Sequence, residues 1–266
     1  MNKNVLFLGL ILLNTITAFC QSENANLQES ERKKLMDASM KTEDKLGWTR
    51  KVGLGLDIGQ LLNLNPYVGG GSNRLGLGGA LAFKTIYKKG MLGWTNDFGL
   101  NFSAQRIGNG VISTNSKEKI PFEKALDILN FSSNFSYKIN SNSAWSFAAD
   151  LFLISQFTSS YKDSLSNKIY LKSIHSASYN TNLVSKFFSP ANIIFALGMK
   201  YQKVANWYFF ISPIASKSII ITDQNIANLG VHGTKKKENS SQFSKSSTGL
   251  GSLARAGYSS KIYKYL

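Results

Sequence analysis

Residues 92–105 read Leu92-Gly-Trp-Thr-Asn-Asp-Phe-Gly-Leu-Asn-Phe-Ser-Ala-Gln105, and their alternating pattern indicates the fold class. With the exception of Asn96, its even positions are apolar or aromatic, and its odd positions are glycine or polar. A period of two sends alternate side chains to opposite faces of a β-strand. One face therefore carries large rings and the other carries small polar groups. This pattern is typical of a strand with lipid on one side and a polar lumen on the other.

The same alternation recurs after Lys51 and predicts about eight strands. They are expected at residues 52–62, 74–87, 92–105, 126–139, 144–158, 192–204, 207–221 and 250–263. Pro213 interrupts the seventh strand, and because proline removes a ladder donor, a bulge or a sheet edge is expected there. We predict an all-β fold, an antiparallel transmembrane β-barrel of about eight strands, with an incomplete larger barrel as the alternative. A soluble all-β sandwich explains the alternation, but not why the rings face one way on every strand.

The connections between these strands alternate in length. Residues 88–91, 140–143 and 205–206 form tight turns, whereas 63–73, 106–124, 159–191 and 222–249 are long and polar. Outer-membrane barrels combine short periplasmic turns with long outside loops, so the long connections are expected outside the cell. Aromatic residues lie beside the tight turns, where an interfacial girdle is expected: Tyr87, Trp94, Tyr137, Trp145 and Trp207.

The N-terminus has the features of a secretory signal peptide. Lys3 supplies the positive charge, Val5 to Ala18 is an apolar run, and cleavage is expected between Cys20 and Gln21. Acylation of Cys20 is an alternative that the large Phe19 disfavours. The expected organisation is a signal peptide at 1–20, a periplasmic segment at 21–50 and the barrel at 51–266. This predicts export to the outer membrane of a Gram-negative bacterium.

Charge and cysteine content narrow the possible partners. The formal net charge is +16 at pH 7, but export and the scattered basic residues argue against nucleic acid. Loop lysines such as those at 235–237 suit the phosphates of lipopolysaccharide, although solvated loops explain them equally well. Cys20 is the only cysteine, so a chain processed after it has no disulfide and no cysteine metal site.

One ordered set of residues points to a family. The set is Trp48, Lys51, Gln60, Gly69-Gly70-Gly71-Ser72, Trp94, Asn96, Lys124, Asp127, Gln156-Phe157, Ser185 to Ala191 around Pro190, Gly198, Tyr201, Ser212-Pro213, Lys217 and Asp223. In this order they resemble an uncharacterised Bacteroidetes outer-membrane β-barrel family, the domain of unknown function 3078. The resemblance covers about Trp48 to Gly233 and departs at Asn65-Pro66-Tyr67 and at the C-terminus. It implies fold and location, but no reaction and no ligand.

Residues with catalytic potential are scarce. His175 and His232 are the only histidines, and both lie in predicted long connections, where solvated histidines are common. Gly69-Gly70-Gly71 is followed by no Lys-Ser or Lys-Thr, so it is not a phosphate loop. We therefore predict no catalytic, cofactor-binding or metal-binding residues, and no cofactor.

Polar residues at inward positions form the candidate site. The tight turns place Lys84 diagonally across from Asp97, and Asn134 opposite Asp150. Together with Lys200, these are the candidate lumen residues. Either they select solutes by charge, or they satisfy one another and fill a narrow barrel, since the interior of eight strands is just wide enough for side chains.

Three functions remain open at this point. The first is a non-enzymatic structural or surface-binding barrel whose partners are outer-membrane lipid and lipopolysaccharide, with a small-molecule ligand left unspecified. The second is porin-like transport of small solutes, which needs an open lumen. The third is a barrel-borne lipid-modifying enzyme, which needs a histidine beside a serine at the membrane level.

Overall fold

The computed structural model describes residues 45–61, 73–108, 120–203 and 207–258. The predicted signal peptide, Gly69-Gly70-Gly71 and the end of the last predicted strand lie outside the described residues. So does most of the predicted periplasmic segment at 21–50.

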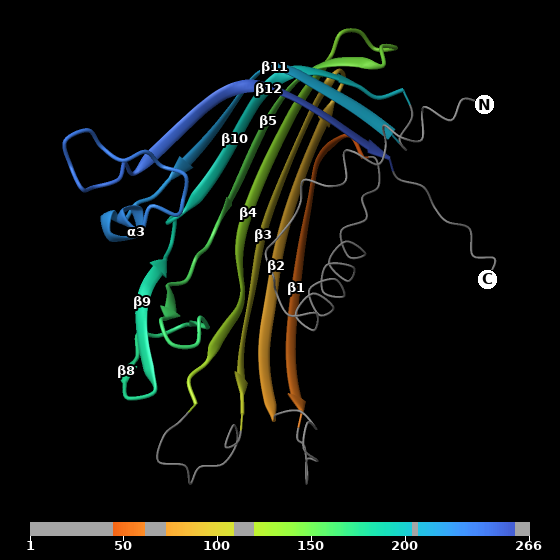
Figure 1. The fold of residues 1–266 in the computed structure, drawn as a ribbon. Coiled ribbons are helices and arrows are strands. Elements are labelled where there is room, and N and C mark those ends of the chain that lie inside the picture. The colour runs from red at the N-terminus through yellow and green to blue at the C-terminus, as the bar shows by residue number, and fades with distance from the viewer. Residues whose placement is uncertain (1–44, 62–72, 109–119, 204–206, 259–266) are drawn as a thin grey trace, which may run out of the picture.

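Long antiparallel strands make up most of the fold (Figure 1). They are β1 (Gly47–Leu61), β2 (Arg74–Lys89), β3 (Leu92–Ile107), β4 (Glu123–Lys138), β5 (Trp145–Ser155), β10 (Ala191–Tyr201), β11 (Trp207–Ile220) and β12 (Ser246–Tyr258). Short strands lie between β5 and β10: β6 (Ser160–Asp163), β7 (Ile169–Tyr170), β8 (His175–Ser176) and β9 (Tyr179–Ser185). Helix α3 (Gln224–Asn228) precedes β12. The predicted all-β, antiparallel class is confirmed.

The strand count of about eight is wrong, because the sheet has 12 strands among the described residues. Each predicted strand corresponds to one long strand, with shifted ends. The additional strands β6 to β9 lie in the connection predicted at 159–191. β7 and β8 are only 2 residues long, so no alternation could reveal them. Likewise, β12 begins at Ser246, inside a stretch predicted as a loop.

The sheet is curled but open. Its long strands follow one another in the order β1-β2-β3-β4-β5-β10-β11-β12. Among the described residues β1 pairs only with β2, and β12 only with β11. The arrangement is therefore a half-barrel and not the closed barrel expected from the sequence (Figure 1). Strand twist curls a sheet, whereas closure needs a ladder between the first and last strands, which alternation within each strand does not encode.

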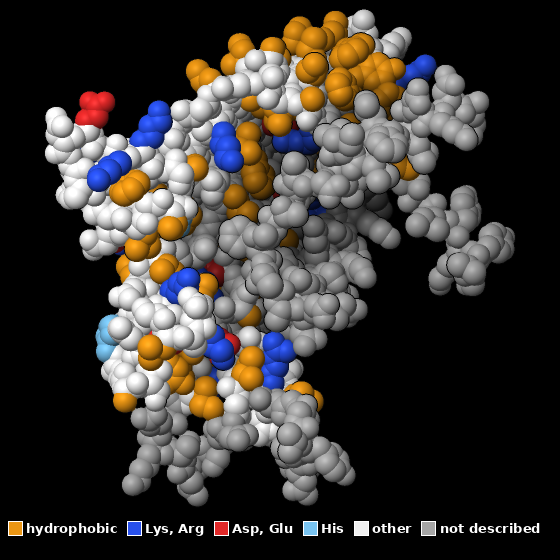
Figure 2. Space-filling model, viewed as in Figure 1, with side chains coloured by type: hydrophobic (Ala, Val, Ile, Leu, Met, Phe, Trp, Pro, Cys, Tyr) orange, Lys and Arg blue, Asp and Glu red, His pale blue; other side chains and the backbone are white. Residues whose placement is uncertain are grey.

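The two faces of the curled sheet differ in chemistry. On the outer face of β1 the side chains of Val52, Leu54, Leu56 and Ile58 are 65–79% exposed. On the other face, Phe210 packs with small side chains: Ala148, Ala196 and Ala215. Figure 2 shows hydrophobic side chains gathered on the outside of the curl at the top of the view, with Lys and Arg side chains beneath them. Among the described residues, no helix is both long and apolar enough to cross a membrane.

Irregular pairing surrounds Pro213, as the sequence predicts. The β11–β12 register shifts between Ser212 and Ala215, and the β10–β11 register shifts at Gly198. A Cβ at Gly198 would lie 2.0 Å from the carbonyl oxygen of Ile211, so only glycine fits this close approach. Ser212 is fully buried, and its Oγ lies 2.7 Å from the carbonyl oxygens of both Leu197 and Ile214, either of which can accept its single hydrogen. These contacts stabilise the bend of the sheet.

Candidate functional site

The first predicted pair of the candidate site is an ion pair on the inner face. Lys84 on β2 lies directly opposite Asp97 on β3, and not diagonally as expected. The Lys84 Nζ is 2.8 Å from Asp97 Oδ1, and both side chains are partly exposed. An ion pair of this exposure contributes about 0–1 kcal/mol.

The second predicted pair centres on Asp150. Asn134 lies opposite Asp150 in the β4–β5 register, and its Nδ2 donates to Asp150 Oδ1 at 3.0 Å. The other carboxylate oxygen accepts from Arg255 Nη1 at 3.1 Å. Arg255 lies on β12, separated from β5 by β10 and β11. The curl of the sheet therefore brings distant strands within hydrogen-bond reach.

These side chains line one cavity of about 280 Å³ on the inner face. All the predicted residues line it, together with Arg255, Tyr208 and Phe210, which the sequence interpretation missed. The Lys200 Nζ lies 5.3 Å from the centroid of the Tyr208 ring, a cation–π distance. We call Lys84, Asp97, Asn134, Asp150, Lys200 and Arg255 the inner polar cluster. In the sequence Arg255 stands between Ala254 and Ala256. This alternation of apolar and charged residues could have identified Arg255 as an inward-facing residue.

A second polar group lies where β4 begins. The Lys124 ammonium contacts the Asp127 carboxylate, and their side chains are 5% and 1% exposed. Lys124 Nζ also donates to Gln156 Oε1 at 3.2 Å and to Ser160 Oγ at 2.5 Å. Asp127 accepts from the backbone N–H groups of Phe157 and Thr158, both at 3.0 Å. The buried charges are thus paired and hydrogen-bonded, as burial requires.

We call these residues, Lys124, Asp127, Gln156, Ser160 and Ser185, the rim network, and they join separate segments of the chain. The Ser185 hydroxyl donates to Gln156 Oε1, so β9 is tied to the residues that follow β5. Lys124, Asp127, Gln156 and Ser185 all belong to the set of residues that carries the family resemblance. In the structure these residues contact one another in one hydrogen-bonded network.

Asp163 organises the short strands beyond this network. Its Oδ2 accepts from the Ser166 hydroxyl at 2.6 Å and its Oδ1 accepts from the Asn180 N–H at 2.8 Å. The hydrogen bond from the Ser166 hydroxyl, followed by the Asn180 N–H, lowers the pKa of Asp163 to about 2. Similarly, the Glu123 carboxylate raises the pKa of Lys168.

Acid is expected to loosen the segment from β6 to β9. The folded pKa of Asp163 lies below its unfolded value of about 3.9, so its contribution is present above about pH 4 and is lost as the pH falls towards 2. Amide hydrogen exchange at Ser166 and Asn180, corrected for the intrinsic rate, should accelerate in this range. The acceleration should be absent in Asp163→Asn. Equal protection of the wild-type amides at pH 6 and pH 2.5 would contradict the assignment.

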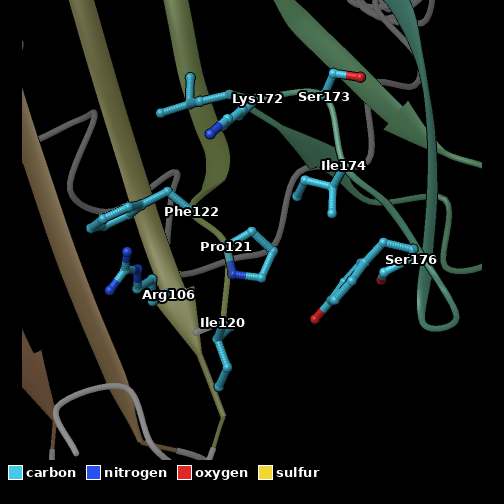
Figure 3. Close-up of a pocket in the computed structure, with 10 residues that line it drawn as sticks. Arg106, Ile120, Pro121, Phe122, Lys172, Ser173, Ile174 and Ser176 are labelled. Carbon is cyan, nitrogen blue, oxygen red and sulfur yellow. The ribbon is translucent and has the colours of Figure 1, made fainter. Parts of the chain in front are cut away.

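A larger cavity, the rim pocket, opens beside the rim network. Its volume is about 560 Å³. The lining residues are Arg106, Ile120, Pro121, Phe122, Leu171, Lys172, Ser173, Ile174, Ser176 and Tyr179. In Figure 3, Ile120, Pro121 and Phe122 lie on one side and face Ile174 and Ser176 on the other. Nothing in the sequence pattern pointed to this pocket, because its walls come from separate connections.

The two histidines occupy different surroundings. His175 Nε2 is 3.3 Å from Ser173 Oγ, and its Nδ1 is 3.3 Å from Asn180 Oδ1. In Figure 3, however, the Ser173 hydroxyl points away from the rim pocket. The Nε2 of His232 is buried without a hydrogen-bond partner among the described residues, and burial lowers the pKa of its side chain. Within the described part of the chain, no group of three or more His, Cys, Asp or Glu side chains is placed to hold a metal ion.

Comparison with known proteins identifies a family over part of the chain. Residues 60–161 match the model of a family described as "Protein of unknown function (DUF3078)". This match confirms the resemblance to that domain of unknown function. No curated protein and no solved structure matches the chain. The matched range contains Lys124, Asp127 and Gln156 of the rim network and four residues of the inner polar cluster, namely Lys84, Asp97, Asn134 and Asp150.

Proposed function

We propose that this chain, whose residues 60–161 match the DUF3078 family model, is an outer-membrane β-barrel protein with a non-enzymatic structural or surface-binding role. The observation that carries the proposal is the two-faced sheet. Its outer face exposes large apolar side chains along whole strands, such as Leu54 and Ile58 on β1. A contiguous apolar face of this extent is unfavourable in water and favourable in a bilayer.

Aromatic contacts at the tight-turn end of the sheet support the proposal. Trp48 lies 4.9 Å from Tyr87 and 5.9 Å from Trp94, measured between ring centroids. A second group joins Tyr201 to Trp145 at 4.9 Å and to Trp207 at 5.3 Å. The indole N–H of Trp94 donates to Ser133 Oγ at 2.9 Å. Rings with an apolar body and a polar contact, gathered at one level, suit the boundary between lipid and water.

The inner polar cluster supports a structural role over a catalytic one. Asp97 and Asp150 both accept from cations, and Asn134 donates to Asp150. Both carboxylates are therefore engaged by donors within the cluster itself. The Ser173 hydroxyl faces away from the rim pocket, so a bound substrate would not meet it there (Figure 3).

A porin-like role is the second candidate, and the open sheet favours it. Among the described residues β1 and β12 are unpaired with each other, and a barrel closed through further strands would have a wider lumen than eight strands provide. The inner polar cluster has three cationic side chains and two carboxylates, so such a lumen would favour small anions.

Thiol labelling on intact cells tests membrane insertion and orientation together. Cysteine at Glu238, in the long connection before β12, should react with a membrane-impermeant reagent. Cysteine at Asn142, in the tight turn between β4 and β5, is the matched control and should not react. Both proteins should stay in the membrane pellet after alkaline extraction. Recovery of the chain in the soluble fraction would refute the proposal.

Two measurements on purified protein test the porin-like role and the lipid-modifying enzymatic role. Planar bilayers containing the full chain should show no stable conductance steps, whereas reproducible steps would favour the porin-like role. Purified protein should also fail to release fatty acid from ester substrates. Release that disappears in Ser173→Ala would overturn the non-enzymatic part of the proposal.

A further inference from the structure

The rim pocket has mainly apolar walls. Ile120, Pro121 and Phe122 come from the residues that lead into β4, whereas Leu171 and Ile174 come from the segment between β7 and β8. The Tyr179 ring also lines the cavity and is supported edge-on by Tyr170, with ring centroids 5.5 Å apart. A volume of about 560 Å³ lies in the range of pockets that bind small ligands.

Among the residues that the structure describes, two cations in this pocket have no acidic partner. The Cζ of Arg106 stacks 4.0 Å from the centroid of the Phe122 ring, which orients the guanidinium group. The Nε of Arg106 is buried and has no hydrogen-bond partner among the described residues. Lys172 is exposed at the mouth, and no carboxylate within the described ranges pairs with it. A buried donor without an acceptor is costly, so an anion in this position would be stabilised.

The position of the pocket in the sheet indicates which anion it meets. Arg106 lies on β3 at the same parity as Phe98, Leu100 and Phe102, the residues of the outer face. It lies at the end of β3 that is opposite the aromatic contacts of Trp94. If the outer face contacts lipid, this end lies at the level of lipid headgroups.

We propose that the rim pocket binds an amphiphile with an acyl chain and an anionic phosphate headgroup. The chain lies against the apolar walls, and the phosphate accepts hydrogen bonds from Arg106 and Lys172. The identity of this ligand class rests on the proposed function, because a membrane supplies such molecules at this level. Binding itself requires only the folded pocket.

Binding of radiolabelled dodecyl phosphate to the full chain in uncharged detergent micelles tests the proposal. Saturable binding with one equivalent per chain is expected. Unlabelled inorganic phosphate, which lacks the chain, and dodecanol, which lacks the charge, should each compete at least tenfold more weakly than dodecyl phosphate. Competition by inorganic phosphate at equal strength would reduce the pocket to a simple anion site and overturn the proposal. Equal competition by dodecanol would show that the two cations do not contribute to binding, and this result would also overturn the proposal.

Single substitutions test whether dodecyl phosphate binds in the rim pocket. Arg106→Gln should weaken binding about tenfold or more, because one charge-assisted contact is lost. Lys172→Gln, at an exposed position where folding is not at risk, should weaken it about threefold to tenfold. The matched control is Lys162→Gln, which removes an exposed charge from β6, outside the pocket, and should leave binding unchanged. Unchanged binding in both pocket variants would refute the proposal.

The outcomes separate this proposal from the proposed function. The binding assay uses detergent-solubilised protein, whereas insertion and orientation are tested by labelling at Glu238 and Asn142. A chain that inserts but binds dodecyl phosphate no better than its variants defeats only the pocket assignment. A chain that binds but stays soluble on expression defeats only the membrane assignment.

Discussion

Asp127→Asn is expected to lower the free energy of unfolding by about 3–5 kcal/mol. The substitution preserves size and removes one negative charge from a pair whose side chains are 5% and 1% exposed. The Lys124 ammonium would then lie in the interior without a counter-charge. The backbone N–H groups of Phe157 and Thr158 would also lose a charged acceptor.

Denaturant unfolding of the refolded protein in bilayers measures this loss. Asp97→Asn is the matched control, because the Lys84–Asp97 pair has side-chain exposures of 25% and 35%. Its expected cost is about 0–1 kcal/mol. The double variant Lys124→Met/Asp127→Leu should recover much of the lost stability, since no charge remains buried. Equal effects of Asp127→Asn and Asp97→Asn would show that the rim network is not a buried ion pair in solution.

Phe131→Arg is expected to cost about 2–4 kcal/mol in a lipid bilayer. Phe131 lies in register with Phe98 on β3 and with Leu153 on β5, within a row of apolar residues across the outer face. A charged side chain at the middle of a lipid-facing strand must lie in hydrocarbon or distort the bilayer.

The same substitution in a turn provides the control for this effect. Asn142→Arg places arginine in the exposed turn between β4 and β5 and should change stability by less than about 0.5 kcal/mol. Folding equilibria in phosphatidylcholine vesicles allow both variants to be compared with wild type. A Phe131→Arg protein as stable as wild type would mean that the outer face does not contact lipid.

Local pairing explains why part of the candidate site could be predicted from the sequence. Lys84 and Asp97 flank one tight turn, and Asn134 and Asp150 flank another, so alternation and hairpin register place each pair together. Arg255 is 105 residues away from Asp150, and no local rule connects them. Their contact depends on how strongly the sheet curls across β10 and β11.

The rim pocket also depends on contacts between distant segments, so the sequence could not predict it. Its walls come from the end of β3, the start of β4 and the short strands β7 to β9. Each of these segments is short and mixed in composition, so none has a periodicity that indicates its partner. The bulge between β3 and β4 also shifts the register near Ala104, which changes the residues that face Lys124 and Glu123.

The alternation in the sequence was therefore enough to predict the eight long strands, their antiparallel order and their two faces, because side chains alternate with a period of two. It did not reveal the short strands β6 to β9. The sequence also predicted a bulge or a sheet edge at Pro213, because proline cannot donate to a ladder, and the structure has a shifted register there. Three features follow only from the three-dimensional structure: the described sheet stays open, Arg255 reaches Asp150, and Arg106 lies in an apolar pocket without a carboxylate partner among the described residues. These features depend on curl, bulges and contacts between distant segments, and all three are set by packing across the whole sheet.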